Sequence, residues 1–301
     1  MIKVAVASLS GLMRKLSDTT PPGLILSIAS ATLVDGKYLT SYLNEFFGTC
    51  LMILCTFSAG KWVGSSSLPV AWVSHFFGVI AADYFGGGPH VNPAVSVSMW
   101  ALGKINYTEC YIRIAAQMGG GLVSFPIYKL VSDSLGWTPF GGPEFEADDE
   151  YGVEAFMSEF WGVLLLLIFI YLVNWEMHFG TYHYWIKQPM TALWIRYLIE
   201  VFPTAGPAIN PMLATSWAVF GVGQEFEFPN DPLHYIVYWI APFAAAVLAS
   251  VLYVIYAGGT IFGQPLPFGP LKEEQAPPAA AVAAEPKKKE EPKKEEPKKD
   301  K

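Results

Sequence analysis

The stretch Gly88–Val95, which reads Gly-Pro-His-Val-Asn-Pro-Ala-Val, occurs again in similar form as Gly206–Leu213, which reads Gly-Pro-Ala-Ile-Asn-Pro-Met-Leu. In each copy a turn rich in Gly and Pro leads into an Asn-Pro pair, and a short apolar run follows. Asn is a favoured helix N-cap, and Pro is favoured at the first helical position, where its missing N–H costs nothing. Both copies therefore predict a loop followed by a helix that is too short to cross a bilayer.

The composition indicates an integral membrane protein. Of the 301 residues, 52% are hydrophobic and only 15% are charged, and the mean hydropathy is +0.34. Much of the charge lies in residues 271–301, so the rest of the chain is poorer still and hard to solvate as a soluble globule. The net charge of −7 does not suggest a nucleic-acid partner. Cys50, Cys55 and Cys110 lack metal-ligand spacing, so we expect neither a metal site nor a cofactor.

Six apolar segments are predicted to span the membrane. They cover about residues 42–62, 70–85, 111–131, 153–173, 189–201 and 233–257. About 20 helical residues cross a hydrocarbon core of about 30 Å, so the second and fifth segments are short by this measure. The expected fold is therefore all-α, with six transmembrane helices and two re-entrant half-helices. Because each half has three spans, an odd number, the two halves are predicted to form an inverted repeat.

Three regions are expected along the chain: a cytosolic N-terminal segment (1–40), a channel domain (41–260, with halves of about 41–131 and 152–257) and a tail (271–301). The tail is rich in Lys, Glu and Pro and has little to bury, so it is predicted to be disordered. Six spans place both termini on one side, and the positive-inside rule makes that side the cytosol. The last four residues, Lys298–Lys301, fit a dilysine retrieval pattern, which favours the endoplasmic reticulum or another internal membrane.

The paired turns predict passive conduction. Two half-helices whose N-termini meet at the midplane would place two positive dipole ends there, which disfavours protons and other cations. The side-chain amides of Asn92 and Asn210 can donate hydrogen bonds to a passing water or hydroxyl group. No nucleophile–base pair or cofactor loop appears, so the chain is not expected to be an enzyme. We therefore predict a channel for water or small neutral solutes.

Several motifs carry a family resemblance. The first turn with its flanks, His90–Ser96, resembles the signature of the major intrinsic protein family, the aquaporins. Glu45–Thr49 is similar to the family's first-span signature, Glu159-Phe160 to its fourth-span counterpart, and Tyr111–Gly119 to its third-span Tyr…Gln-x-Gly pattern. The resemblance covers about residues 42–256. It implies an aquaporin-like fold and homotetramers with one pore in each subunit.

The second turn departs from the family pattern. The family usually has Asn-Pro-Ala-Arg where this chain has Asn210, Pro211, Met212 and Leu213, whereas Asn92, Pro93 and Ala94 are intact in the first turn. The second half is most similar to the unorthodox subgroup of plant small basic intrinsic proteins and animal superaquaporins. By the family's spacing, the outer selectivity filter falls on Trp72 (or, in another alignment, Phe77), Leu198, Pro207 and Leu213. The usual arginine is missing, so this filter is predicted to be apolar.

Some polar residues within the apolar spans are predicted to support the turns. Glu45 and Glu159 are expected to accept backbone N–H groups from the re-entrant loops, because buried carboxylates need partners. His90 and Gln117 are assigned to the packing of the first loop. Arg196 and Glu200 lie four residues apart and predict an ion pair on one helix face. In the alternative interpretation, Arg196 supplies the charge that Leu213 lacks.

Two other functions stay open at this point. Ion- or proton-coupled carriers also use broken helices and inverted repeats, and Arg196, Glu200 and Asp83 would then be the coupling charges. The changes at Met212 and Leu213 also allow a structural tetramer that has lost transport. In each case the expected partners are the lipid bilayer and further copies of the chain.

Overall fold

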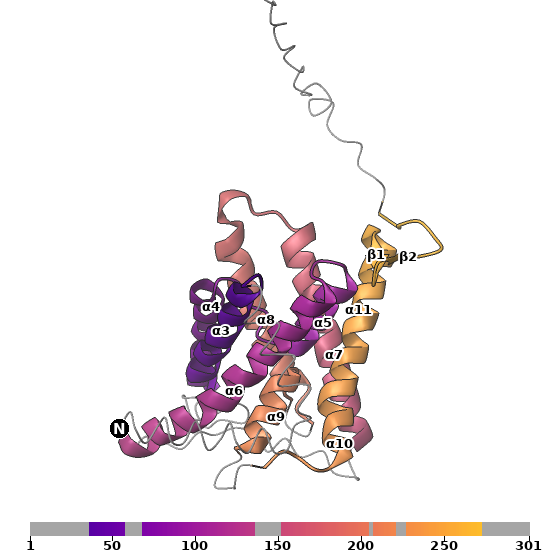
Figure 1. Ribbon diagram of the computed structural model, residues 1–301. Coiled ribbons are helices and arrows are strands. Elements are labelled where there is room, and N and C mark those ends of the chain that lie inside the picture. Colours follow the sequence, from indigo (N-terminus) through magenta and orange to yellow (C-terminus); the bar gives the residue numbers. More distant parts are fainter. Residues whose placement is uncertain (1–35, 58–67, 136–151, 205–206, 221–226, 273–301) are drawn as a thin grey trace, which may run out of the picture.

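The computed structural model describes residues 36–57, 68–135, 152–204, 207–220 and 227–272. Within them the helices run in the order shown in Figure 1: α3 (Leu39–Phe57), α4 (Leu68–Gly86), α5 (Pro93–Ala101), α6 (Tyr107–Leu135), α7 (Gly152–Tyr171), α8 (His183–Val201), α9 (Pro211–Val219), α10 (Pro232–Tyr235) and α11 (Ala241–Ala257). A π-helical turn η1 (Leu172–Glu176) extends α7, and a second, η3 (Ile236–Ile240), joins α10 to α11. A short 3₁₀ turn, η2 (Gly180–Tyr182), precedes α8.

The strands among the described residues form a small hairpin after α11. Strands β1 (Thr260–Ile261) and β2 (Gln264–Pro265) pair antiparallel, with Thr260 opposite Pro265. Two glycines at 258 and 259, with φ of +83° and +117°, end the helix in a conformation that residues with a Cβ rarely adopt. The chain therefore turns back onto the bundle here, although the sequence predicted no element in this place.

The tail begins later than the sequence suggested. The backbone N–H groups of Leu271 and Lys272 donate to carbonyl oxygens of α11 at 3.0 and 2.8 Å, so these two residues are part of the folded body. The Lys272 ammonium also donates to Glu176 at 2.6 Å. The remainder of the predicted tail, the N-terminal residues 1–35 and residues 136–151, a connection that contains several acidic side chains, lie outside the described residues.

The fifth predicted span was too short. The predicted span begins at Pro189, but α8 begins at His183 and contains this proline, so the helix has 19 residues. A proline six residues into a helix removes one backbone donor and strains one turn, and α8 tolerates this near its beginning. Helix α6 is likewise longer than its predicted span, with 29 residues, and contains Pro126.

The two halves of the chain use the same set of helix pairings. Helix α3 packs on α4 and α6, and α7 correspondingly packs on α8 and α11. The short helices cross between halves, because α5 packs on α11 and α9 packs on α6. Helices α4 and α8 contact one another, as do α5 and α9. The two short helices consequently lie inside the bundle, as Figure 1 shows.

A glycine allows one of these short helices to approach its neighbour. A Cβ placed on Gly121 of α6 would lie only 2.7 Å from Met212 Sδ and 2.8 Å from Ser216 Cβ, both on α9. Small residues at helix crossings permit such close contact between backbones. The position of α9 therefore depends on the absence of a side chain at residue 121.

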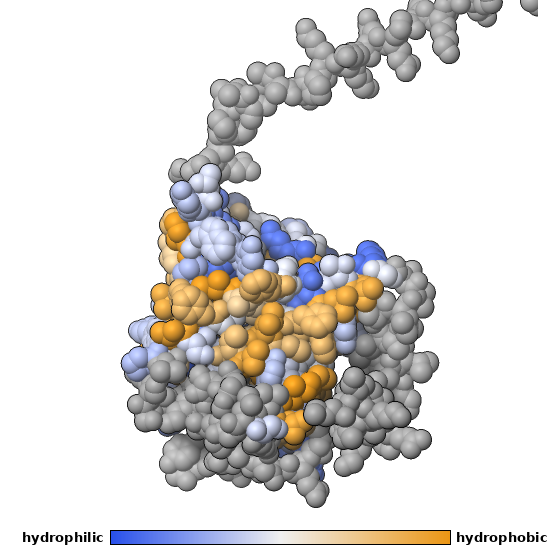
Figure 2. All heavy atoms as spheres, turned by 90° about the vertical axis from the view of Figure 1, so that its left-hand side faces the viewer, coloured by the Kyte–Doolittle hydropathy of each residue, from blue (hydrophilic) through white to orange (hydrophobic). Residues whose placement is uncertain are grey.

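The outer surface carries large apolar side chains. Figure 2 shows an apolar band across one face, below a more hydrophilic end. Among the exposed apolar side chains are Phe47 on α3 and Val73 on α4, each 56% exposed. Two helical stretches of the described residues, Gly152–Glu176 and Pro232–Ala257, are long and apolar enough to cross a bilayer, which is weak evidence taken alone.

Candidate functional site

Asn92 and Asn210 cap the two short helices. Asn92 Oδ1 accepts the backbone N–H of Ala94 at 2.9 Å, and Asn210 Oδ1 accepts that of Met212 at 3.1 Å. A proline occupies the first helical position of both α5 and α9. The predicted sequence of loop, Asn cap and short helix is therefore confirmed in both halves.

Each asparagine also bonds to the loop of the other half. Asn92 Nδ2 donates to the carbonyl oxygen of Ile209, and Asn210 Nδ2 donates to that of Val91, both at 2.8 Å. A carboxamide has two N–H groups, so these bonds use one donor of each asparagine and leave the second for another acceptor. The two turns, distant in sequence, thus form one cross-linked unit.

The residues that accept these cross-links have an unusual backbone conformation. Val91 has φ of +49° and Ile209 has φ of +41°. Positive φ is a rare conformation for β-branched residues and costs about 1–3 kcal/mol at each position. The strain is placed at the two residues whose carbonyl groups join the turns, and the same geometry occurs in both halves. Nothing in the local sequence predicts it, because valine and isoleucine ordinarily avoid this region.

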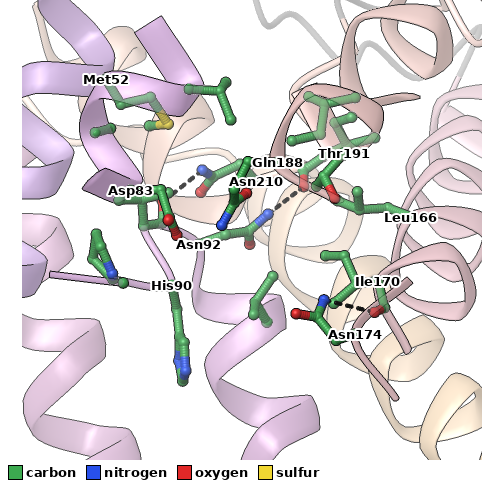
Figure 3. A pocket seen from close by; sticks show the side chains of 18 of the residues that line it. Met52, Asp83, His90, Asn92, Leu166, Ile170, Asn174, Gln188, Thr191 and Asn210 are labelled. Carbon is green, nitrogen blue, oxygen red and sulfur yellow. Dashed lines mark hydrogen bonds between the residues drawn. The ribbon is translucent and has the colours of Figure 1, made fainter. Parts of the chain in front are cut away.

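A cavity of about 380 Å³ lies against the cross-linked turns. Asn92 and Asn210 line it, and α4, α5, α7 and α8 provide most of the remaining wall. Figure 3 shows the two asparagines side by side, with Met52 toward one end of the cavity and Asn174 toward the other. Because both helix caps line the same space, the positive dipole ends of α5 and α9 face one cavity.

Glu45 holds the first turn from α3. Its side chain is fully buried, and its two oxygens accept the backbone N–H groups of His90 and Val91, both at 2.8 Å. Arg113 donates to the same carboxylate at 2.7 Å and Gln117 at 2.8 Å, both from α6. The buried charge is therefore paired and hydrogen-bonded, as a buried carboxylate requires. Sequence reasoning missed Arg113, although it lies one helical turn before Gln117 and hence on the same face.

His90 and Gln117 meet on the first residues of α5. The Nδ1 atom of His90 lies 3.0 Å from Ser96 Oγ, and Gln117 Nε2 donates to the same hydroxyl oxygen at 3.0 Å. Ser96 is fully buried. The contacts join the loop, α5 and α6 around a single hydroxyl group.

Glu159 occupies the corresponding place in the second half. It is 1% exposed on α7, and one oxygen accepts the backbone N–H of Ala208 at 2.6 Å. No Lys, Arg or His of the described residues forms an ion pair with this carboxyl group. Both glutamates thus accept from the backbone of a loop, but among the residues that the structure describes only Glu45 has a cationic partner.

The predicted filter residues differ in their relation to the cavity. Leu213 lines it, whereas Trp72, Leu198 and Pro207 do not. Trp72 lies three residues before His75, and Leu198 lies three residues after Ile195. Both His75 and Ile195 line the cavity. Since residues three apart share a helix face, both continue the cavity-lining faces of α4 and α8 by one turn. Phe77, the alternative in α4, is 62% exposed on the outer surface.

His75 is a cavity residue that sequence reasoning missed. It is 3% exposed, and it begins a stripe on α4 that continues through Val79 and Ala82. The spacing of this stripe could have identified it, because residues three and four apart recur on one helix face. The predicted ion pair between Arg196 and Glu200 is confirmed by a direct contact. Arg196 is not among the cavity-lining residues. The alternative role, in which Arg196 supplies the positive charge that Leu213 lacks, stays a prediction.

The comparison with protein families decides the identity of this arrangement. The family model described as "Major intrinsic protein" matches residues 32–253, which is most of the chain. The chain belongs to the major intrinsic protein family. Its members are channels rather than enzymes, so this major intrinsic protein is a multi-pass membrane protein and a channel for water or small solutes.

Individual relatives are distant. This major intrinsic protein is 25% identical to Aquaporin-4 of Milnesium tardigradum over 261 residues, which cover 78% of the chain and 73% of the relative. It is also 25% identical to an aquaglyceroporin of Plasmodium berghei (strain Anka), with 72% and 90% covered. Among solved structures, the X-ray structure of the aquaglyceroporin from Plasmodium falciparum matches with a TM-score of 0.56 and 20% identity, over 72% of this chain and 96% of that one. The structural match shows the fold alone, and the likeness to the unorthodox subgroup stays a prediction.

Proposed function

We propose that this protein conducts water or small neutral solutes passively and excludes protons and other ions at the two cross-linked turns. The observation that carries the proposal is the mutual bonding of Asn92 and Asn210 beside the cavity that both residues line. The N-termini of α5 and α9 place partial positive charge there, which opposes cations. The second N–H of each asparagine offers a hydrogen bond to a neutral solute.

The proposed membrane arrangement has six spans, with α5 and α9 as re-entrant half-helices in an inverted repeat. The matching pairings of the two halves support it. Leu213, which lines the cavity, then forms an apolar filter together with Trp72, Leu198 and Pro207. Glu45, Glu159, His90 and Gln117 act as supports of the loops, since they bond to the loops or to the start of α5.

The proposed orientation places both termini in the cytosol. Lys104, Lys187 and Lys272 contact successive residues of η1, at Trp175, Asn174 and Glu176, so these cations gather at one end of the bundle. The positive-inside rule makes that end cytosolic. Homotetramers in an internal membrane complete the proposal, and they rest on the family resemblance and on the Lys298–Lys301 pattern.

Transport in proteoliposomes tests this function. We expect osmotic water flow, or flow of glycerol or urea, above that of empty liposomes, without a measurable proton current under a pH gradient. Solute flow that follows an imposed proton gradient would instead indicate the coupled carrier, for which Asp83 is a cavity-lining charge. Flow equal to that of empty liposomes for every solute would indicate a structural tetramer.

A further inference from the structure

Polar side chains gather at one end of the cavity. Asp83 of α4, Asn174 of η1, and Tyr184 and Lys187 of α8 all line it. The Tyr184 hydroxyl donates to the Asp83 carboxylate at 2.7 Å, and the Lys187 ammonium donates to Asn174 Oδ1 at 2.6 Å. We refer to these four residues as the polar mouth. They come from three different elements, so the grouping is a product of the fold.

The polar mouth lies apart from the predicted filter. Asp83 is eight residues after His75 on α4, which corresponds to about 12 Å along a helix. Lys187 is likewise eight residues before Ile195 on α8. Asp83 is near the end of α4, whereas Tyr184 and Lys187 are near the beginning of α8. In Figure 1 η1 and the beginning of α8 lie toward the same end of the bundle, at the top.

The two ends of the cavity offer different chemistry. Eight residues along α4 and α8 from the polar mouth, the lining consists of His75 and Ile195, and Leu213 of α9 adds another apolar side chain to the wall. The polar mouth contains one carboxylate and one ammonium, so it is neutral overall and carries both a strong acceptor and a strong donor. A carboxylate can accept about four hydrogen bonds, so Asp83 has capacity beyond its contacts with Tyr184 and Gln188. An ammonium has three donors, so Lys187 has capacity beyond its contact with Asn174.

Size allows a solute larger than water at this end. Water occupies about 30 Å³ in the liquid, so a cavity of about 380 Å³ has room for a solute of several heavy atoms together with water. A solute loses part of its hydration when it enters. Charged donors and acceptors compensate this loss more strongly than neutral ones. The compensation is available at the polar mouth and is weaker at the Leu213 end.

We propose that Asp83 and Lys187 are specificity-determining residues of the channel. The polar mouth admits small neutral solutes that carry several hydroxyl or amide groups, because such solutes can donate to Asp83 and accept from Lys187 together. The permeability of the channel for solutes of this class therefore rises relative to its permeability for water. The apolar filter end does not set this preference. The inference rests on the proposed channel function and names the solute class that the same pathway favours.

The test compares permeability ratios of the full-length protein in proteoliposomes. Asp83→Leu and Lys187→Met each remove one charged partner at similar size. We expect each to lower the glycerol-to-water and urea-to-water permeability ratios about tenfold, the effect of losing about one charge-assisted hydrogen bond. If Asp83→Leu does not yield folded protein, Asp83→Asn removes the charge alone, with an expected decrease of about threefold.

Matched controls lie outside the cavity wall. Lys104→Met removes an exposed cation at the same end of the bundle, and Glu154→Leu removes an exposed carboxylate from α7; both are expected to leave the ratios unchanged. A common decrease of water and solute flow in the Asp83 and Lys187 variants, with constant ratios, would show a merely structural role and overturn the proposal. Equal changes of the ratios in the controls would overturn it as well. A wild-type protein that conducts nothing would overturn both the channel function and this inference, whereas unchanged ratios in a conducting protein overturn the inference alone.

Discussion

Glu45 and Glu159 stand behind two turns of the same shape, but their surroundings differ. Glu45 accepts two backbone N–H groups and is paired with Arg113, which also bonds to Glu109. Glu159 accepts the N–H of Ala208 and has no ion-pair partner among the described residues. The caps, the cross-links and the positive φ angles nevertheless agree between the two turns. The shape of a turn therefore follows from its own residues and from the opposite turn more than from the carboxylate behind it.

The same substitution in both halves tests this difference most strongly. Glu45→Gln removes the buried charge beside partly buried Arg113, so we expect the free energy of unfolding to fall by about 3 kcal/mol, the lower end for breaking a buried ion pair, because Glu109 still neutralises the arginine. Glu159→Gln keeps an oxygen for the Ala208 N–H and is expected to cost about 1 kcal/mol or less. Denaturation of the purified protein in detergent measures both. Equal losses would mean that the ion pair does not distinguish the two turns.

The asparagines are expected to respond alike. Asn92→Asp and Asn210→Asp keep the oxygen that caps the helix but remove the N–H that reaches the opposite loop. Each variant then leaves one buried carbonyl oxygen without its donor, which is expected to cost about 1–3 kcal/mol of unfolding free energy and to reduce water flow. Denaturation and stopped-flow light scattering measure the two effects. A loss in one variant only would show that the cross-links are not equivalent.

A glycine beside the second turn gives the smallest expected effect. A Cβ at Gly121 would crowd Met212 and Ser216, which costs about 1–3 kcal/mol as overpacking, while Ala in place of a helical Gly gains about 0.5–1 kcal/mol. We therefore expect Gly121→Ala to destabilise the protein by about 1–2 kcal/mol. Gly119→Ala is the matched control, because its Cβ would be 3.5 Å from the nearest atom, an ordinary contact. Thermal denaturation measures the stability of both variants. A lower stability of Gly119→Ala than of Gly121→Ala would contradict this packing account.

Much of each turn was predictable from the sequence because its signals are local. An Asn before a Pro specifies a capped helix start through atoms within three residues, and this prediction holds at both α5 and α9. The boundary of α8 was less predictable, since Pro189 resembles a helix start and only the neighbouring residues decide whether the helix continues on both sides. The positive φ of Val91 and Ile209 opposes local preference, so a local argument could not find it.

The sequence by itself determined the short capped helices, the apolar segments and the family, since these depend on neighbouring residues or on motifs that can be compared directly. Only the tertiary structure decided that Asn92 bonds to the loop of Asn210, that Arg113 pairs with Glu45 and that Asp83 meets Tyr184. The partners in these contacts lie 117, 68 and 101 residues apart. No local periodicity encodes such a contact, because it forms only when packed helices bring distant segments together.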